Sequence, residues 1–401
     1  MFCKYSKKKI NSFMSFGKMP LANGFLERKD FKNEFFFNLE VGFSEKYSLF
    51  QINEFPNPKK MFRNNYPFFT SSSKFMIEHF KNYSNWIKKK ILKTNAKLIE
   101  IGSNDGTFLK NFKNTGIDYI GFEPAKNIFK KNKKFKLNIV NDFFSYESLQ
   151  KDYLKKFIKK TDVICGSNVI CHIPYIRDII EIIKKLLNKK GFFIFEEPYL
   201  GSMFEKTAYD QIYDEHIFMF SVTAIKKIFQ EYDMDLINIM PQTTHGGSIR
   251  YIIANKKIYS ISKSVNYFLE IEKKKKIDSI EGCLDFKRNC EISKHELKKK
   301  LLLLKKKNKK ISGYGATSKS TTILNYCNIG PEIIDYICDN TKDKIGKFSP
   351  GKHIPVVPIS TFRQNIPNFC YLFAWNHKKE IFLKEKKFLK NGGKWISHVK
   401  L

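Results

Sequence analysis

A chain of 401 residues exceeds what one ordinary hydrophobic core supports, so two or three domains are expected. Hydrophobic residues make up 42% of the chain and aromatic residues 15%, which excludes a mainly disordered protein. The formal net charge of +34 raises the question of a nucleic acid or an anionic membrane as partner.

The positive charge is nearly all lysine and is spread along the whole chain, together with many Ile, Asn and Phe residues. The runs Lys273–Lys276 and Lys305–Lys307 lack the interleaved arginine and aromatic side chains that stack on bases. We therefore interpret most of this charge as a compositional bias on a solvated surface and expect no nucleic-acid partner. A generally positive field favours an anionic small substrate.

Cysteine usage and the N-terminal residues bear on the compartment. The eight cysteines include no CxxC pair, and several fall in apolar, strand-like runs, so no disulfide framework is implied. The first residues lack the apolar core of a signal peptide, and no run approaches the ~18 apolar residues that span a bilayer. These features predict a cytoplasmic protein without a membrane partner.

The order of the expected elements divides the chain into three domains. Residues 1–75 contain short strand-like pieces, a loop around Pro56–Pro58 and no long helical period, which indicates a small irregular module. Residues 76–260 alternate expected strands and helices. Residues 261–401 begin with a lysine-rich helical connector (261–309) and continue with a second βα series.

In the middle domain, a helix over 72–93 is predicted to bury Phe75, His79, Phe80 and Trp86. Strands are predicted at 97–101, 119–122, 162–166 and 191–195, with helices from 107, from 125 and over 175–187, and a terminal antiparallel pair at 236–240 and 248–254. Repeated units of this kind indicate a parallel sheet covered by helices on both faces.

The buried side of the connector is predicted to carry Phe268, Ile271, Leu284 and Leu297. After the connector, strands are expected at 310–313, 333–338 and 369–373, with a helix after the first strand and another after the last. The predicted class is α/β: a Rossmann-like nucleotide-binding domain between a small N-terminal module and a C-terminal Rossmann-like α/β lobe.

The segment from Glu100 to Gly106 joins a strand to the start of a helix. Gly102 and Gly106 permit backbone angles denied to other residues and let a ligand approach the main chain. Glu123, about twenty residues further along at the end of the next strand, is placed to accept hydrogen bonds from a ribose diol. The pattern predicts an adenosine-type ligand, because a purely structural turn would not require the later acid.

The identity of this ligand depends on the third position of the turn. Dinucleotide sites usually have glycine there, whereas this chain has Asn104. The segment suits the zwitterionic methionine end of S-adenosylmethionine instead. The residues predicted to bind this cofactor are Glu100, Gly102, Asn104, Asp105, Gly106, Glu123 and Asn168.

Two polar segments follow expected strands. Asn168 and His172 interrupt an apolar run where it should leave the sheet beside the cofactor, although a structural histidine is the alternative. Tyr213, Glu215 and His216 lie within four residues of one another. Methyl transfer to carbon requires removal of a proton next to a ketone and stabilisation of the enolate oxygen. An imidazole can take that proton, and a tyrosine or a second histidine can donate a hydrogen bond to the oxygen. The structural alternative for this segment is a charged and aromatic loop packed under a lid.

Taken together, these motifs resemble the sugar C-methyltransferases. The likeness covers essentially the whole chain and rests on Pro20–Asn23, Glu100–Gly106, Asn168–His172, Tyr209–His216, His245–Arg250 and Gly313–Lys319. Enzymes of that family use S-adenosylmethionine to methylate a carbon of nucleotide-linked deoxy-ketosugars.

The resemblance implies roles for particular residues. His216 would be the general base, Tyr213 and His172 would assist at the enolate oxygen, and Glu215 would orient the sugar or the imidazole. The C-terminal lobe would complete the cleft for the nucleotide-linked sugar, with the turn Gly313–Ala316 and Lys319 near the diphosphate. The residues expected at the substrate are Tyr66, Tyr209, His245, Arg250, Gly313, Gly315 and Lys319.

One departure from that family concerns metal. Its members usually carry an N-terminal zinc site with two cysteine pairs. Here Cys3–Ser6 and Ser44–Tyr47 occupy the equivalent places, so one thiol remains, whereas a structural zinc normally has four Cys or His ligands. We therefore expect no zinc and no other metal, with the module held by its many Phe side chains.

Other functions remain compatible with the residues. O- or N-methylation needs a base but no enolate stabiliser, and a basic RNA-modifying methyltransferase would use the positive charge. A non-catalytic scaffold is indicated by the missing thiols, but the intact cofactor turn and the intact His216 segment argue against it.

Overall fold

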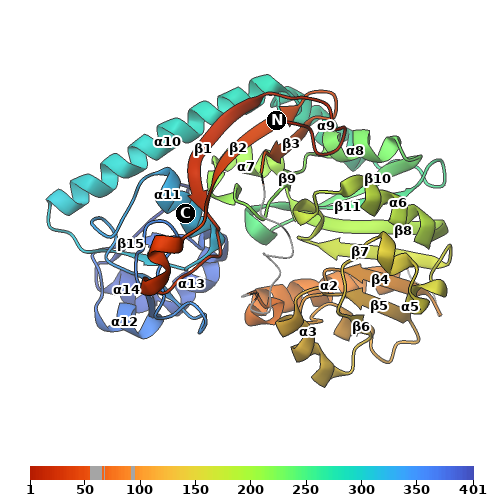
Figure 1. Cartoon of the computed structure of the whole chain (residues 1–401), viewed down its shortest axis with the longest axis horizontal. Coiled ribbons are helices and arrows are strands. Elements are labelled where there is room, and N and C mark those ends of the chain that lie inside the picture. The colour runs from red at the N-terminus through yellow and green to blue at the C-terminus, as the bar shows by residue number, and fades with distance from the viewer. Residues whose placement is uncertain (55–65, 67, 92–94) are drawn as a thin grey trace.

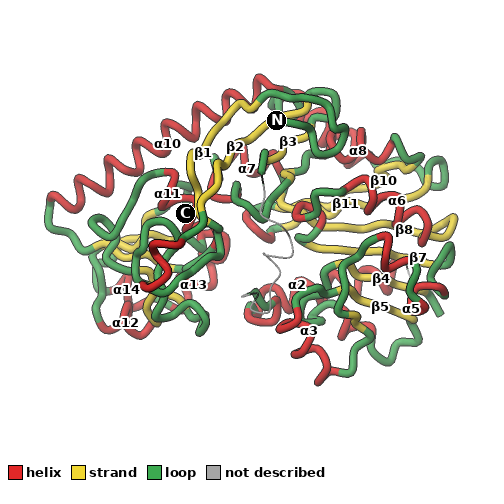
Figure 2. Tube along the Cα trace, viewed as in Figure 1, coloured by secondary structure: helices red, strands yellow, loops and turns green. Residues whose placement is uncertain are grey.

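A computed structural model describes residues 1–54, 66, 68–91 and 95–401. Within these residues the chain forms three sheets, one in each of the three domains (Figures 1 and 2). The predicted loop around Pro56–Pro58 lies outside the described residues.

The N-terminal module is an antiparallel sheet with the order β1-β2-β3-β9. Its strands are β1 (Ser12–Pro20), β2 (Phe36–Ser44) and β3 (Leu49–Ile52), with a 3-10 turn at Arg28–Asn33. The fourth strand, β9 (Phe218–Met219), comes from the middle domain and pairs with β3. The module is therefore built into the rest of the molecule, and β1 and β2 run between the two larger lobes (Figure 1).

The middle domain is a seven-stranded sheet with the order β10-β11-β8-β7-β4-β5-β6. Its strands are β4 (Lys97–Ile101), β5 (Asp118–Phe122), β6 (Ile139–Val140), β7 (Thr161–Ser167), β8 (Leu187–Pro198), β10 (Met234–Gln242) and β11 (Ser248–Asn255). The five neighbouring strands β8, β7, β4, β5 and β6 are parallel to one another. Strand β11 is antiparallel to both β8 and β10, so the predicted antiparallel pair at the end of this domain, β10 and β11, is confirmed. The chain reverses its direction of winding between β4 and β7, and ligands of such sheets bind at that point.

Helices cover both faces of this sheet (Figure 2). They are α2 (Lys74–Lys90), α3 (Lys126–Asn132), α4 (Tyr146–Leu149), α5 (Asp152–Lys155), α6 (Ile176–Leu186), α7 (Leu200–Lys206) and α8 (Val222–Gln230). The predicted burial of Phe75 is wrong, because its side chain is 44% exposed. The Ser73 hydroxyl caps α2, and the buried stripe of the helix runs through Met76, Phe80, Tyr83 and Ile87, one residue away from Phe75.

The helix predicted from Thr107 is only the 3-10 turn η3 (Leu109–Phe112). The Asn111 side chain donates to the carbonyl groups of Thr107 and Phe108, which an α-helix would use for its own amides. Local side-chain hydrogen bonding therefore replaces the expected helix.

The connector consists of α9 (Lys263–Lys274) and α10 (Ile280–Lys306), and α10 runs along one edge of the molecule to the C-terminal lobe (Figure 1). Leu297 is buried as predicted, but Leu284 is 46% exposed. The buried stripe of α10 passes through Cys283 and Phe286 instead, and these two residues lie on either side of Leu284 in the sequence.

The C-terminal domain is a five-stranded parallel sheet with the order β14-β13-β12-β15-β16. Its elements are β12 (Ile311–Tyr314), α11 (Ser318–Tyr326), β13 (Ile337–Asp339), β14 (Val356–Pro358), α12 (Ile359–Gln364), β15 (Phe369–Leu372), α13 (Lys378–Lys384), α14 (Lys386–Lys390) and β16 (Lys394–Ile396). The predicted strand from Ile333 starts later, because the amides of Ile333 and Ile334 close a turn on the Gly330 carbonyl. The short strands β14 and β16 were not predicted.

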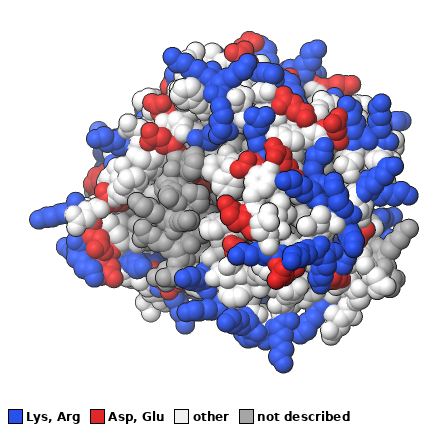
Figure 3. Space-filling view, turned by 45° about the vertical axis from the view of Figure 1, so that its right-hand side comes forward, with Lys and Arg blue, Asp and Glu red and all other residues white. Residues whose placement is uncertain are grey.

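The surface charge can be followed on one face of the molecule. On the described part of the face in Figure 3, lysine and arginine side chains are scattered with acidic side chains among them. Among the described residues, no helix is both long enough and apolar enough to cross a bilayer. The eight cysteines are all buried and none forms a disulfide.

Phe50 of β3 provides a test of the packing that joins the domains. Its buried ring lies against Phe13, Phe204 of α7 and Phe286 of α10, at centroid distances of 5.6, 6.2 and 6.4 Å. We expect Phe50→Ala to lower the free energy of unfolding by about 3–5 kcal/mol, because it leaves a cavity in this cluster. Urea unfolding measures the change. Phe35→Ala, at a ring that is 56% exposed, is the control, and an equally small effect of both substitutions would contradict the packing described.

Candidate active site

A cavity lies at the carboxyl ends of β4, β5 and β7, where the sheet topology predicts a ligand. The predicted cofactor residues that line it are Glu100, Gly102, Asn104, Glu123 and Asn168. Gly102 has φ of +70°, and a Cβ atom there would lie 2.8 Å from Val169 Cγ2. The turn therefore requires glycine at this position.

Two carboxylates frame this cavity. Glu123 accepts hydrogen bonds from the amides of Asn104 (2.9 Å) and Ala125 (2.7 Å), and burial raises its pKa to about 7. Burial also raises the pKa of Glu100 well above its ordinary value. Within the described part of the chain, Glu100 Oε2 and Asn168 Oδ1 are buried without a hydrogen-bond partner. Buried polar atoms of this kind indicate a site for a polar ligand.

Two other residues predicted to bind the cofactor do not line the cavity. The Asp105 carboxylate accepts from the Ser71 amide (2.8 Å) and from the Thr107 hydroxyl (2.6 Å). Gly106 packs against Leu137, and a Cβ atom there would lie 2.4 Å from Leu137 Cδ1. Asp105 and Gly106 therefore stabilise the conformation of the turn and do not face the cavity.

The segment Tyr209–His216 presents a buried imidazole. Gln211 O accepts a hydrogen bond from His216 Nδ1 (2.8 Å), which leaves the Nε2 lone pair to accept from the Tyr213 hydroxyl (2.7 Å). Burial lowers the pKa of His216 well below its ordinary value, and the nearby His172 acts in the same direction. Burial raises the pKa of Tyr213 well above its ordinary value, so both groups are neutral at pH 7. A neutral imidazole with a defined tautomer is suited to accept a proton at Nε2.

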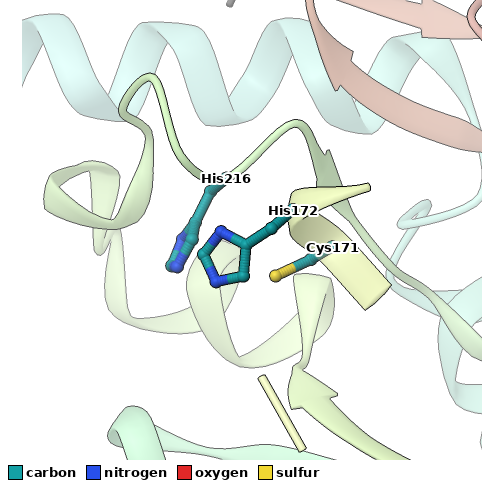
Figure 4. A group of neighbouring side chains, drawn as sticks. All are labelled: Cys171, His172 and His216. Carbon is teal, nitrogen blue, oxygen red and sulfur yellow. The ribbon is translucent and has the colours of Figure 1, made fainter. Parts of the chain in front are cut away.

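His172 faces this imidazole from the 3-10 turn η5 (Ile170–His172), and the two ring centroids are 5.2 Å apart (Figure 4). The Glu197 carboxylate accepts from the amides of Val169, Ile170 and Cys171 at the start of η5, at 3.0, 2.7 and 3.3 Å. His172 Nδ1 is hydrogen-bonded to the Glu215 carbonyl, and its Nε2 is therefore the acceptor atom.

Cys171 lies beside the two histidines, and the potential metal-ligand atoms of the three residues are within 4.8 Å of one another (Figure 4). Burial and the Glu197 carboxylate raise the pKa of the Cys171 thiol well above its ordinary value. Metals bind the thiolate, and His216 Nε2 is already hydrogen-bonded to Tyr213. The arrangement favours proton transfer over metal binding.

The N-terminal module contacts the same loop. The Ala22 amide donates to Asp214 Oδ1 (2.9 Å), and Asn23 Nδ2 donates to Glu215 Oε1 (2.6 Å). Burial and Glu215 raise the pKa of Asp214 to about 8. Lys344 of the C-terminal domain donates to the Ala316 carbonyl (2.7 Å) and reaches Asn23 Oδ1 at 3.4 Å. The sequence offered no signal for Lys344, which is one lysine among many.

Three of the predicted substrate residues lie near the histidines. Tyr66 and His245 line the same cavity as the cofactor residues, and burial lowers the pKa of His245 to about 3. The Lys319 ammonium is buried and lies 4.2 Å from the centroid of the Trp375 ring, and burial lowers its pKa. Its positive charge contributes to the low pKa of His216 and of His245.

The other predicted substrate residues are engaged within the protein. Arg250 forms a buried ion pair with Glu196 (Nε to Oε1, 2.7 Å) and lies over the Tyr83 ring. Tyr209 is buried with its hydroxyl 3.4 Å from Cys327 Sγ.

The glycine turn at the end of β12 is occupied by the protein itself. Gly313 and Gly315 permit close packing, with Cβ positions 2.6 Å from Phe373 Cε2 and 2.9 Å from Ala374 Cβ. The Ala316 amide, which a phosphate would use, donates to Asp339 Oδ2 at 2.7 Å. The structure therefore brings neither glycine to a ligand-binding surface.

Comparisons with known proteins match three consecutive segments of the chain. Residues 2–62 match a family described as a zinc binding domain, residues 78–239 a methyltransferase domain, and residues 243–399 a C-methyltransferase C-terminal domain. The chain is 26% identical over 386 residues to the C-methyltransferase NovU of Streptomyces niveus, covering 96% of this chain and 91% of that protein.

Two solved structures are similar to part of the chain. The YcgJ protein of Bacillus subtilis is 13% identical with a TM-score of 0.36, covering 45% of this chain and 99% of that one. The magnesium protoporphyrin IX methyltransferase of Synechocystis PCC 6803 is 10% identical with a TM-score of 0.34, covering 45% of this chain and 79% of that one.

The residues present fit S-adenosylmethionine but not zinc. The cavity offers buried, unpartnered oxygens of Glu100 and Asn168 within the described residues, and a carboxylate at Glu123. Residues 1–75 contain one cysteine, Cys3, and no histidine, so they cannot supply four Cys or His ligands. Near Cys3, the hydroxyls of Tyr5 and Tyr47 donate to the two carboxylate oxygens of Glu231, at 2.6 and 2.7 Å.

The absence of a zinc ligand set leads to a stability prediction. Because direct side-chain contacts hold the N-terminal module, we expect a strong zinc chelator to leave the melting temperature of the purified protein unchanged. Differential scanning calorimetry with and without the chelator measures this. A clear drop in melting temperature, restored by added zinc, would show that a bound ion stabilises the fold.

Proposed function

We propose that the protein is an S-adenosylmethionine-dependent C-methyltransferase whose acceptor is a carbon next to the ketone of a nucleotide-linked deoxy-ketosugar. Its matches to a methyltransferase domain, to a C-methyltransferase C-terminal domain and to NovU support this proposal. One observation carries this proposal. A buried, neutral imidazole, His216, has its Nε2 directed to a phenol, with a second imidazole beside it and the cofactor cavity adjacent.

Proton removal is assigned to His216. Its Nδ1–H is donated to the Gln211 carbonyl, so Nε2 is the atom that accepts the sugar α-proton. That hydrogen bond also stabilises the imidazolium formed in the step. The low pKa of His216 keeps the free base available across the neutral pH range.

Enolate stabilisation is assigned to Tyr213. His172 Nδ1 already donates to the Glu215 carbonyl, so in this tautomer its Nε2 has no proton to donate to the enolate oxygen. The Tyr213 hydroxyl donates to His216 Nε2 in the absence of substrate, so it must turn from that nitrogen to the ketone oxygen when the sugar binds. A neutral phenol in a buried site is a strong donor to a developing oxyanion. Glu215, which accepts from Asn23, is assigned the role of orienting a sugar hydroxyl.

S-adenosylmethionine, when bound, supplies an electrophilic methyl group on a sulfonium. In this proposal Glu123 accepts hydrogen bonds from its ribose diol, and Glu100 with Asn168 contacts its methionine end. Tyr66 and His245 line the same cavity, and contact with the sugar is assigned to them. Lys319, a buried cation near His245, favours an anionic nucleotide-linked substrate.

The proposal is tested by the exchange of the sugar α-proton with deuterium from the solvent. The substrates are a panel of nucleotide-linked 4-ketosugars without the methyl donor, followed by mass spectrometry. We expect the wild type to catalyse exchange and His216→Ala to lose about 10²-fold or more, because the general base is absent. His295→Ala, at an exposed histidine of α10, is the matched control.

The outcomes separate the candidate reactions. An O- or N-methyltransferase transfers the methyl group without catalysing exchange at carbon. Near-normal exchange by His216→Ala would instead show that another group is the base.

Cofactor affinity should depend on the protonation of Glu123. Its pKa of about 7 is raised by burial, so the carboxylate that accepts from the ribose is present above this value and is lost as the pH falls through it. We expect calorimetry to show weaker binding of S-adenosylmethionine at pH 6 than at pH 8. The Glu123→Gln variant should bind weakly at both, and a pH-independent affinity of the wild type would exclude this role.

A further inference from the structure

Asp210 is a buried carboxylate at the start of the loop that carries His216. It lies in the 3-10 turn η6 (Tyr209–Gln211), and its exposed fraction is 0%. Removing an ionised carboxylate from water is costly unless charged or hydrogen-bonding groups surround it. The groups that compensate this carboxylate therefore show which part of the molecule holds the loop.

Among the residues that the structure describes, the side-chain partners of Asp210 all come from the C-terminal domain. Trp375 Nε1 donates to Oδ2 (2.6 Å), and His398 Nε2 lies 3.2 Å from Oδ1. The Lys319 ammonium, from α11, lies 4.0 Å from Oδ2. Lys319 and both donors act to lower the pKa of Asp210, so the group is a carboxylate at neutral pH.

The tautomer of His398 follows from its contact with Asp210. The ionised carboxylate can only accept, so His398 Nε2 carries the proton and donates to Asp210. His398 Nδ1 is then left to accept from the Tyr371 hydroxyl (2.8 Å), whose oxygen accepts from the His398 amide (3.2 Å). Both carboxylate oxygens of Asp210 accept from an N–H donor. An asparagine at this position would present its NH2 group to one of these two donors, so one of the hydrogen bonds would be lost.

The carboxylate is one residue away from the acceptor that orients the catalytic imidazole. Asp210 precedes Gln211, whose carbonyl accepts from His216 Nδ1 at 2.8 Å. Gln211 itself is held by the hydrogen bond from its amide to the Ala208 carbonyl (3.1 Å). A rotation of the Asp210–Gln211 backbone would turn this carbonyl away from His216 and release the imidazole.

We propose that Asp210 is a positioning residue through which the C-terminal domain holds the Gln211 carbonyl, and with it the His216 imidazole, in the orientation that presents Nε2 to the substrate. The inference rests on the proposed role of His216 as the general base. It gives the C-terminal domain a second task beside substrate binding. Domain contacts far along the sequence then control the rate of proton removal.

The experiment uses the full-length protein with two substitutions: Asp210→Asn, which keeps the size and the shape of the side chain, and Trp375→Phe, which removes the indole N–H together with part of the ring. Three quantities are measured: the α-proton exchange rate without methyl donor, the affinity for S-adenosylmethionine, and the proton NMR signal of His216 Nδ1–H. Asp233→Asn, at an exposed carboxylate, is the matched control.

We expect Asp210→Asn to slow exchange by about 10- to 100-fold and Trp375→Phe to slow it less, with unchanged cofactor affinity. The Nδ1–H signal should shift or broaden in both variants. Because both substitutions act on one contact, the double variant should lose less than the product of the two single losses. A purely structural role would lower the melting temperature and leave the exchange rate of the folded fraction and the signal unchanged.

The two proposals fail in different ways. Absence of exchange by the wild type would remove the proposed function, while the NMR signal would still report whether Asp210 holds His216. Wild-type exchange together with an unchanged signal and rate in folded Asp210→Asn would overturn the positioning role. If Asp210→Asn does not fold, the NMR signal and the exchange rate of Trp375→Phe test the positioning role in its place.

Discussion

The hydrogen bond from His216 Nδ1 to the Gln211 carbonyl is the interaction on which the proposed chemistry depends. A buried imidazole has two possible tautomers, and only one of them leaves Nε2 free to accept a proton. Burial keeps the ring neutral, and the carbonyl selects the tautomer. The rest of the site can be understood as the structure needed to hold that carbonyl and that ring in place.

Each of the three domains contributes to this arrangement. The middle domain supplies the cofactor cavity and the loop itself, and the N-terminal segment at Ala22 and Asn23 donates hydrogen bonds to the carboxyl groups of Asp214 and Glu215. The C-terminal domain binds the Asp210 carboxylate through hydrogen bonds from Trp375 and His398. The candidate active site therefore lies where the domains meet, and β9 and the connector α9–α10 link these domains.

The sequence was sufficient for features that depend on local pattern. Apolar strands followed by glycine turns predicted both α/β sheets, and the spacing of Gly102 and Glu123 predicted where the cofactor cavity lies. It failed where a long-range contact decides the outcome. Arg250 looked available for a substrate, but its partner Glu196 lies on the neighbouring strand, and no spacing rule reveals that pairing. The contacts of Asp210 and Lys344 gave no sequence signal either, because their partners lie far along the chain.

The most direct test of the account is the position of the transferred methyl group. The protein would be incubated with S-adenosylmethionine carrying a 13C-labelled methyl group and a 13C-labelled nucleotide-linked ketosugar, and the product analysed by NMR. The account predicts a one-bond carbon–carbon coupling between the new methyl and the ring carbon next to the ketone. A methyl group attached to oxygen or nitrogen, without that coupling, would contradict it.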